Sequence, residues 1–170
     1  MNDPEPVRKS KPCCFLPLVS STPPHKLAEG APIQPRWAAG AEGYAEIHAD
    51  LEPGLRDLEG IERIWLLYWF DRAKPAALEV VPFMDTRSHG IFATRAPCRP
   101  NPIGMSSVRL LGIEGNRLHL GDVDMLDGTP LLDIKPYLPS CDVFTVTGLG
   151  WYAQATEAVP ADDRFTKSVE

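Results

Sequence analysis

Prolines spread along the whole chain constrain its fold more than any other feature of the sequence. Eighteen of the 170 residues are proline, about twice the average usage, and they separate short apolar runs. Since proline fixes φ and has no amide hydrogen, it interrupts long helices and the interior of sheets. A chain of this length is typical of one domain. The sequence therefore predicts a single domain built from many short elements.

Short apolar and aromatic runs are the expected strands. Residues 64–70 are typical of a central strand buried on both faces, with Trp65 and Trp69 packed in the core. Residues 108–113 and 118–123 flank a Gly-Asn turn and are expected to form a hairpin. Further elements are expected as strands over residues 13–19, 43–48, 78–83 and 142–147, helical turns over residues 53–59, and a long ordered loop over residues 20–40. Strands outnumber helices, which favours a mainly β barrel or sandwich.

Charge and cysteine usage limit the class of protein. The net charge of -6 argues against a protein that binds nucleic acid over its whole surface, although a local basic patch is compatible with it. The cysteines and histidines have no zinc-ligand spacing, so we expect no metal, and free thiols indicate the reducing cytoplasm. The longest apolar run is far shorter than a membrane span, so we expect no membrane segment.

The first segment with candidate functional residues covers residues 86–113. It contains Arg87, Arg95, Arg99 and Arg109 but no Asp or Glu, and three prolines lie within six residues of it. A loop stiffened by proline loses little entropy on ordering, and a fixed guanidinium suits carboxylate or phosphate. The segment therefore predicts an anion site. The alternative is a surface loop whose arginines pair with nearby acids. Cysteine-nucleophile chemistry in this loop is a weaker alternative, since no histidine lies nearby in sequence.

A second segment, residues 122–137, is acidic. Asp122, Asp124, Asp127 and Asp133 fall within twelve residues, around an Asp-Gly-Thr-Pro turn. Such carboxylates could bind a divalent metal, ribose hydroxyls, an ammonium group or an exocyclic amine, although the spacing is not that of an EF-hand. The alternative is that they cap turns by bonding to the nearby backbone.

Both segments resemble the signatures of the TsaA/TrmO-like (YaeB) family. The matching stretches are residues 92–105 (FATRAPCRPNPIGM) and 127–137 (DGTPLLDIKPY). Weaker matches are residues 32–35 (PIQP), 58–61 (LEGI) and 65–68 (WLLY), so the resemblance covers about residues 15–140. No Gly-x-Gly-x-x-Gly motif of the Rossmann type is present.

The resemblance implies both a fold and an activity. The fold is a single-domain, mainly β, antiparallel β-barrel with a few short helices. We expect it over residues 13–152, after a flexible leader over residues 1–12 and before a tail or short helix over residues 153–170. The activity is S-adenosylmethionine-dependent N6-methylation of threonylcarbamoyl-adenosine at position 37 of tRNA by a homodimer. Many bacterial members have a further C-terminal domain, which we do not expect in this chain.

Carried over by position, the resemblance also implies a cofactor site near the subunit interface. Its expected residues are Pro32, Gln34, Asp71, Arg72, Arg95, Met105, Asp122, Val123, Asp124 and Leu126. Two places depart from the family pattern. Ile33 stands where the family usually has arginine, and Asp71 with Arg72 stands where many members have histidine and a polar residue.

The expected division of labour follows from the two segments. Asp127 is expected to position the amine, with Lys135 and Tyr137 supporting the catalytic site by hydrogen bonds. Arg95 is expected to hold a carboxylate of the cofactor or substrate. The substrate-binding set, expected to meet phosphates of the tRNA anticodon loop, is Arg87, Arg99 and Arg109. Two alternatives stay open: a methyltransferase for a small molecule, which the acidic pI favours, and a non-catalytic cofactor-binding module.

Overall fold

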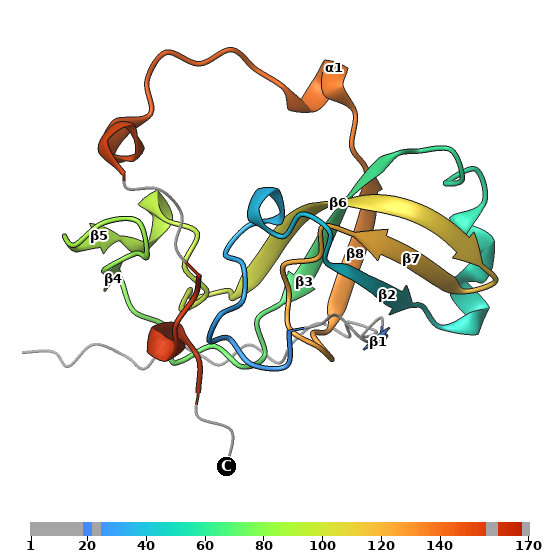
Figure 1. Cartoon of the computed structure of the whole chain (residues 1–170), viewed down its shortest axis with the longest axis horizontal. Coiled ribbons are helices and arrows are strands. Elements are labelled where there is room, and N and C mark those ends of the chain that lie inside the picture. The colour runs from blue at the N-terminus through green and yellow to red at the C-terminus, as the bar shows by residue number, and fades with distance from the viewer. Residues whose placement is uncertain (1–18, 22–24, 156–159, 168–170) are drawn as a thin grey trace, which may run out of the picture.

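The computed structural model describes residues 19–21, 25–155 and 160–167 (Figure 1). Strands make up most of its regular structure, and the helices are short. The strands are β1 (Val19–Ser21), β2 (Glu42–Glu46), β3 (Arg63–Trp69), β4 (Glu79–Val80), β5 (His89–Gly90), β6 (Ile103–Glu114), β7 (Arg117–Gly121) and β8 (Leu131–Pro136). The helices are α1 (Pro139–Asp142) and the 3-10 turns η1 (Pro35–Trp37), η2 (Ala49–Leu55), η3 (Ile91–Ala93), η4 (Gly150–Gln154) and η5 (Asp163–Phe165).

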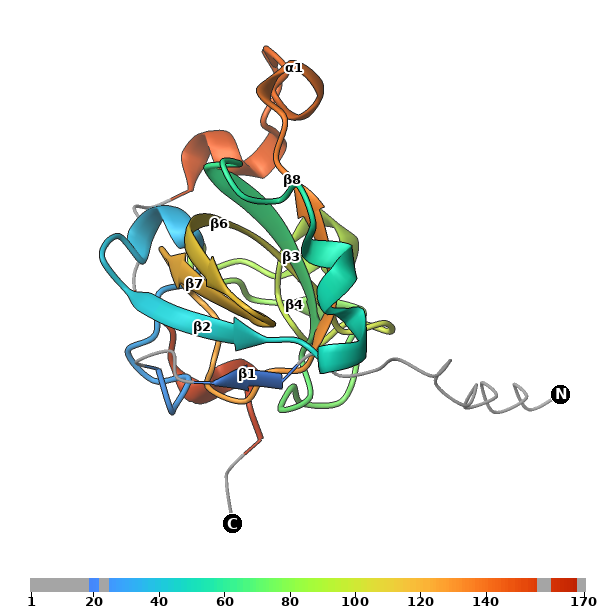
Figure 2. The same ribbon diagram turned by 90° about the vertical axis from the view of Figure 1, so that its right-hand side faces the viewer.

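Six of the strands form one antiparallel sheet in the order β1-β2-β7-β6-β3-β8. The long strand β6 pairs with β7 on one side and with β3 on the other, and its register shifts between Leu110 and Gly112. Figure 2 shows the resulting curvature, with β2 and β3 crossing at a steep angle. A mainly β, antiparallel fold is thereby confirmed. Within the described residues β1 and β8 remain two separate edges, so closure into a barrel stays a prediction.

The central strand β3 has one buried face rather than two. Ile64, Leu66 and Tyr68 are buried, whereas Trp65 and Trp69 alternate with them on the other face and are half-buried. Trp65 donates a hydrogen bond from Nε1 to a carboxylate oxygen of Asp142 at 3.2 Å. The expectation that both faces of this strand are buried is therefore wrong, because its other face is covered only in part. The predicted position inside the sheet is confirmed, since β3 lies between β6 and β8.

Several predicted elements are present with altered bounds. The hairpin is confirmed as β6 and β7, with Gly115 at the turn in a positive φ of 59°. The strand expected over residues 43–48 is β2, and that expected over residues 78–83 shrinks to β4. The helical turns begin earlier than predicted, at Ala49, and are of the 3-10 type. Of the strand expected over residues 13–19, all but Val19 lies outside the described residues.

The strand predicted over residues 142–147 is wrong. Residues 138–150 are all exposed, and among them the regular structure is the short helix α1 and the first residue of η4. They form an arm that leaves β8 and crosses to η4 beside β5 (Figure 1). A β-rich pattern forms a strand only when a neighbouring strand pairs with it, and none of the described strands does so here. No helix among the described residues is long and apolar enough to cross a membrane.

The C-terminal segment, residues 160–167, packs onto the body of the domain. Ala161 exchanges backbone hydrogen bonds with Gly30 and Ala31, both at 2.8 Å. Thr166 bridges to Ala73, and Phe165 is buried in a small second core. This core also contains Val80, Ile91, Ala96 and Cys98. Residues 160–167 are therefore an integral part of the packing, and the tail or short helix expected over residues 153–170 stays a prediction. The domain limits at residues 12 and 152 stay a prediction.

Candidate functional site

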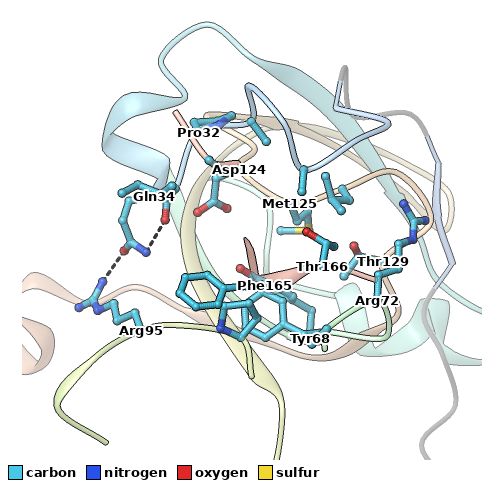
Figure 3. Close-up of a pocket in the computed structure, with 18 of the residues that line it drawn as sticks. Pro32, Gln34, Tyr68, Arg72, Arg95, Asp124, Met125, Thr129, Phe165 and Thr166 are labelled. Atoms are coloured by element: carbon cyan, nitrogen blue, oxygen red, sulfur yellow. Dashed lines mark hydrogen bonds between the residues drawn. The ribbon is translucent and has the colours of Figure 1, made fainter. Parts of the chain in front are cut away.

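A cavity of about 310 Å³ opens where five chain segments meet, a size that suits a small organic ligand. The segments are the loop before η1, the end of β3, the proline-rich loop between η3 and β6, the turn after β7, and the C-terminal segment (Figure 3). Its walls combine aromatic and apolar side chains with a few charged groups. The lining residues used below are Gln34, Tyr68, Asp71, Arg72, Arg95, Arg99, Met105, Asp124, Asp162 and Phe165.

The glycine of the Pro-Ile-Gly sequence makes room for the aromatic floor of this cavity. Gly104 on β6 pairs with Tyr68 on β3, and a Cβ at position 104 would overlap the Tyr68 ring. The Tyr68 ring also contacts Phe70 edge-on, with the ring centroids 5.2 Å apart. The absence of a side chain at Gly104 therefore sets the position of Tyr68.

Arg95 and Gln34 form one wall. The Arg95 guanidinium donates a hydrogen bond to the side-chain oxygen of Gln34, and Gln34 Nε2 donates to the carbonyl of Ile33 at 2.6 Å. Arg95 is exposed, so its remaining donors are accessible to an anion. Gln34 and Arg95, which come from two separate stretches predicted to contact the cofactor, thus meet at this wall. Ile33 contributes a backbone acceptor at the position where the family usually has arginine.

Asp124 lies across the cavity from Arg95, at the end of a buried hydrogen-bond chain. Ser106 Oγ donates to Asp124 Oδ1 at 2.7 Å, and Tyr68 Oη lies 3.0 Å from Ser106 Oγ. Burial raises the pKa of Asp124 to about 7, while the hydrogen bond from Ser106 and the charge of Arg95 act in the opposite direction. Burial also raises the pKa of Tyr68 far above its ordinary value. The Asp124 carboxylate therefore changes charge near neutral pH.

Arg72 closes another side of the cavity. Its guanidinium donates to the backbone carbonyl of Asp127, and its Nε lies 3.8 Å from Asp71 Oδ2. The amide of Asp127 donates to the carbonyl of His25, in the segment before η1, at 2.9 Å. These contacts hold the Asp-Gly-Thr-Pro turn against the end of β3. A positive φ of 74° at Gly128 requires glycine in that turn.

The three predicted catalytic residues are not among the described residues that line the cavity. Asp127 contributes its backbone to the turn, and it is not among the described residues that line the cavity. Lys135 forms an ion pair with Asp133 at 2.7 Å on the outer part of β8. The Tyr137 ring lies 5.5 Å from the Trp65 ring, near the opposite end of β3 from Tyr68. Their catalytic roles stay a prediction, since Lys135 and Tyr137 lie along and beyond β8 and not among the described residues of the cavity lining.

The predicted arginine patch is not a free basic surface. Arg109 and Arg63 both pair with Asp122, at 3.3 and 2.6 Å. Asp122 therefore closes an ion-pair cluster and does not line the cavity, although it was expected to contact the cofactor. Val123, from the same prediction, is buried in the main core. Arg109 therefore fits the alternative given in the sequence analysis, in which the arginines of this segment pair with nearby acids.

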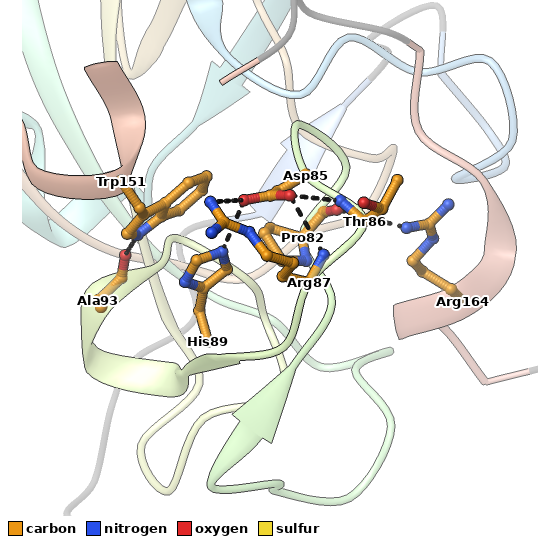
Figure 4. Close-up of polar contacts among 8 residues, drawn as sticks. All are labelled: Pro82, Asp85, Thr86, Arg87, His89, Ala93, Trp151 and Arg164. Atoms are coloured by element: carbon orange, nitrogen blue, oxygen red, sulfur yellow. Dashed lines mark hydrogen bonds and ion pairs between the residues drawn. The ribbon is translucent and has the colours of Figure 1, made fainter. Parts of the chain in front are cut away.

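Arg87 and Arg99 also have partners inside the domain. Arg87 pairs with Asp85 at 3.2 Å, and His89 Nε2 lies 2.9 Å from the same carboxylate oxygen (Figure 4). Arg99 Nη1 donates to the carbonyls of Ile91, Thr94 and Ala96, so that it holds the proline-rich loop in shape while it lines the cavity. The rigidity that its prolines predict stays a prediction.

Most of the residues expected to bind the cofactor do line the cavity. They are Pro32, Gln34, Asp71, Arg72, Arg95, Met105, Asp124 and Leu126. Sequence reasoning missed Tyr68, which belongs to a strand assigned to the core, and Phe165 and Thr166, which lie outside both motifs. The alternation of β3 was the signal that could have separated Tyr68 from its neighbours. Cys98 is buried, and burial raises the pKa of its thiol, so it serves packing and not nucleophilic chemistry.

Comparison with known proteins assigns the chain to a family. The fold and the cavity define a mainly β protein with a ligand-sized pocket beside its sheet. The chain matches the tRNA-methyltransferase O N-terminal domain over residues 20–143, and it belongs to that family.

Curated relatives and solved structures agree with that assignment. A probable S-adenosyl-L-methionine-binding protein of Pyrococcus abyssi is 49% identical over 138 residues, which cover 81% of this chain and 75% of that protein. The tRNA (adenine(37)-N6)-methyltransferase of Escherichia coli K12 is 34% identical over 157 residues, 86% of this chain and 66% of the enzyme. The crystal structure of TrmO from Pseudomonas aeruginosa superimposes with a TM-score of 0.65 at 38% identity, covering 79% of this chain and 60% of that one. This chain thus spans less than two thirds of the enzyme and of the TrmO chain.

Proposed function

We propose that this protein transfers a methyl group from S-adenosylmethionine, and that the cavity beside Arg95 and Asp124 is the cofactor site. The cavity fits the chemistry of that cofactor. Arg95 offers a guanidinium for its carboxylate, the carboxylate of Asp71 suits cationic or hydroxyl groups, and aromatic walls suit the adenine. When bound, the cofactor supplies a methyl group activated by a sulfonium. The protein's part is to orient the acceptor and exclude water.

For the acceptor we propose N6 of threonylcarbamoyl-adenosine at position 37 of tRNA. Family membership and the similarity to the Escherichia coli enzyme of that name support it. The observation from the structure that supports it best is that the two sequence motifs meet at one cavity, with a cation on one wall and a carboxylate on the other. The threonyl group of this nucleoside carries a carboxylate of its own, so Arg95 has a second potential partner on the acceptor side.

A homodimer acting in the cytoplasm completes the proposal. The arm of residues 138–150 presents Val143, Phe144, Val146 and Leu149 to solvent, each between 57% and 77% exposed. Apolar side chains gathered in this way are typical of a protein interface. Trp151, at the far end of the arm, donates from Nε1 to the carbonyl of Ala93 at 2.8 Å and so ties the arm to the loop that carries Arg95 (Figure 4). A second copy seated on the arm would therefore lie near the cavity.

The test of the acceptor uses purified protein, methyl-labelled cofactor, and tRNA from cells that lack the corresponding N6-methyltransferase. Nucleoside mass spectrometry should detect methylated threonylcarbamoyl-adenosine. Arg95→Ala should lower the rate at least about a hundredfold through lost positioning of a carboxylate, with an unchanged melting temperature. Arg56→Ala is the matched control, because this arginine is highly exposed and its ion-pair partner among the described residues is Asp57, itself exposed. Full activity of Arg95→Ala would contradict the assignment of this site.

A small-molecule acceptor is the second candidate. The net charge of -6 and the paired state of Arg87, Arg99 and Arg109 favour it, since these arginines were expected to meet phosphates. A titration with tRNA at low salt separates the two candidates. An absence of binding there favours the small molecule, because phosphate contacts are strongest at low ionic strength. Tight cofactor binding without formation of S-adenosylhomocysteine from any acceptor would indicate a non-catalytic module.

A further inference from the structure

We propose that the Asp124 carboxylate is the proton acceptor of the methyl-transfer step, and that Ser106 and Tyr68 are its positioning residues. The inference rests on the proposed function. It departs from the sequence analysis, which placed Asp127 at the reacting amine and Asp124 against the cofactor. The structure distinguishes the two, because the Asp124 side chain lines the cavity and Asp127 is not among the described residues that line it.

The chemistry of the proposed acceptor requires a proton acceptor. N6 of threonylcarbamoyl-adenosine is bonded to the purine ring on one side and to a carbonyl carbon on the other. Its lone pair is delocalised into both, so the neutral nitrogen is a poor nucleophile, and its N–H is more acidic than that of a simple amine. Removal of this proton as the new bond forms leaves an electron pair on the nitrogen that can bond to the methyl carbon. A side chain within hydrogen-bond reach of that nitrogen is therefore needed.

Among the described residues, no arginine lies within ion-pair distance of the Asp124 carboxylate, in contrast to the other carboxylates of the cavity. The cavity carboxylates among the described residues are Asp71, Asp124 and Asp162. Asp162 forms an ion pair with Arg164 at 2.7 Å, which holds the pKa of Asp162 below its usual range. Asp71 lies 3.8 Å from Arg72. Asp124 has hydroxyl support instead, and its carboxylate points into the cavity (Figure 3).

The hydroxyl chain behind Asp124 has one consistent direction. Ser106 has a single hydroxyl hydrogen, and it is directed to Asp124 Oδ1. Tyr68 must then be the donor to Ser106, so both hydroxyls point toward the carboxylate. This arrangement favours the ionised form of Asp124, while burial disfavours it. The balance of the two leaves the pKa of Asp124 at about 7, where a general base works best at physiological pH.

Other charged groups around the cavity act on Asp124 from several elements. Arg95 faces it from the proline-rich loop and stabilises its ionised form. Tyr68 faces it from β3 and stays protonated, because burial raises its pKa far above the ordinary value. The other charged residues that line the cavity are Asp71, Arg72, Arg99 and Asp162. Arginine contributes no titration near neutral pH, so a kinetic transition near pH 7 belongs to Asp124.

The step balances without a further reagent. The acceptor nitrogen attacks the methyl carbon, the N–C bond forms as the S–C bond breaks, and the sulfur keeps that electron pair as a neutral thioether. The N–H proton passes to the Asp124 carboxylate, which becomes a neutral acid. Opening of the site to solvent then returns the proton to water.

The test compares Asp124→Asn with wild type in three measurements. Methyl transfer should fall about a hundredfold to ten-thousandfold, the range that a positioned base contributes. The affinity for S-adenosylhomocysteine, measured by calorimetry, should stay within about threefold, because the base serves the acceptor and not the cofactor. Asp57→Asn is the matched control, since Asp57 is exposed in a turn with a φ of 66° that asparagine tolerates well.

The third measurement needs no cofactor. The folded-state pKa of Asp124 is raised from 3.8 to about 7, so between those values the folded protein binds a proton that the unfolded chain does not. The unfolding free energy of wild type should therefore fall as pH rises through this window, and that component of the slope should be missing in Asp124→Asn. An identical pH dependence of the two proteins would show that Asp124 does not titrate there, which overturns the proposal.

Ser106→Ala tests positioning separately from folding. The wild-type rate should rise with pH through a midpoint of about 7. Removal of the Ser106 hydrogen bond should move this midpoint to higher pH and leave the high-pH rate within a few fold, whereas a merely structural defect would lower the rate at every pH. Loss of S-adenosylhomocysteine binding by Asp124→Asn, or retention of full activity, overturns the role of Asp124 alone. No product from wild type with the modified tRNA overturns the proposed function, and the role of Asp124 with it.

Discussion

The roles of several single residues in this protein cannot be predicted from their residue types alone. Gly104 is a strand residue whose missing side chain admits the Tyr68 ring, and Tyr68 in turn supports the Ser106–Asp124 pair. Asp122 adopts a positive φ of 62° and joins two arginines from neighbouring strands. Asp124, two residues along, faces the cavity. Neighbouring aspartates of one acidic stretch therefore have different roles, which are set by the direction in which each side chain points.

Gly104→Ala is expected to displace Tyr68 and break the hydroxyl chain. A methyl group at position 104 overlaps the ring, so we expect a loss of about 1–3 kcal/mol in unfolding free energy, the usual cost of overpacking. Gly112→Ala on the same strand is the matched control, because nothing lies within 4 Å of a Cβ there. Denaturant titration of both variants measures the difference. Equal stability of the two would contradict the steric role of Gly104.

At the scale of elements, the sequence predicted what depends on local pattern and missed what depends on tertiary contact. The hairpin and β2 were predictable because turn residues and alternation are local signals. The failed strand over residues 142–147 has the same local signal but finds no partner among the described strands. The arginines and aspartates were recognised by type and motif. Which of them face the cavity could not be predicted, because Asp122 is also paired with Arg63, which comes from β3 and is distant in sequence.

The C-terminal segment, residues 160–167, is expected to contribute to ligand binding through Phe165. Phe165 packs edge-on against Phe83, with ring centroids 5.1 Å apart, and lines the cavity. Phe165→Ala should cost about 3–5 kcal/mol locally and loosen residues 160–167. We expect the affinity for S-adenosylhomocysteine to fall at least about tenfold. A loss of about 1.4 kcal/mol in binding free energy is sufficient for that change.

Phe92→Ala serves as the matched control for this change, since Phe92 is 77% exposed and absent from the cavity lining among the described residues. Calorimetric titration measures both variants. Unchanged affinity in Phe165→Ala would show that the segment packs beside the site without shaping it.

At the scale of the whole molecule, the exposed arm sets what the protein can assemble into. The main core is enclosed by the sheet, and the arm adds apolar surface that this core does not use. Phe144→Asp is expected to weaken the proposed dimer, because a charge in a desolvated interface costs more than one at the rim. We expect the dimer dissociation constant to rise at least about tenfold, measured by sedimentation at several concentrations.

Thr145→Asp is the matched control, since it adds the same charge at the neighbouring exposed position. Should both variants remain as associated as wild type, the arm is not the dimer interface. A wild-type protein that is monomeric at all concentrations would remove the dimer from the proposal.

The docking of residues 160–167 has a thermodynamic consequence. These residues lie beyond the part of the chain that matches the family model, yet they complete the cavity. A ligand that binds only when this wall is in place stabilises the docked segment by the same free energy with which docking strengthens binding. Occupancy of the cavity is thereby linked to the order of the C-terminal segment. Each of the two reports on the other, so that backbone amides of residues 160–167 should exchange their hydrogens more slowly when the site is filled.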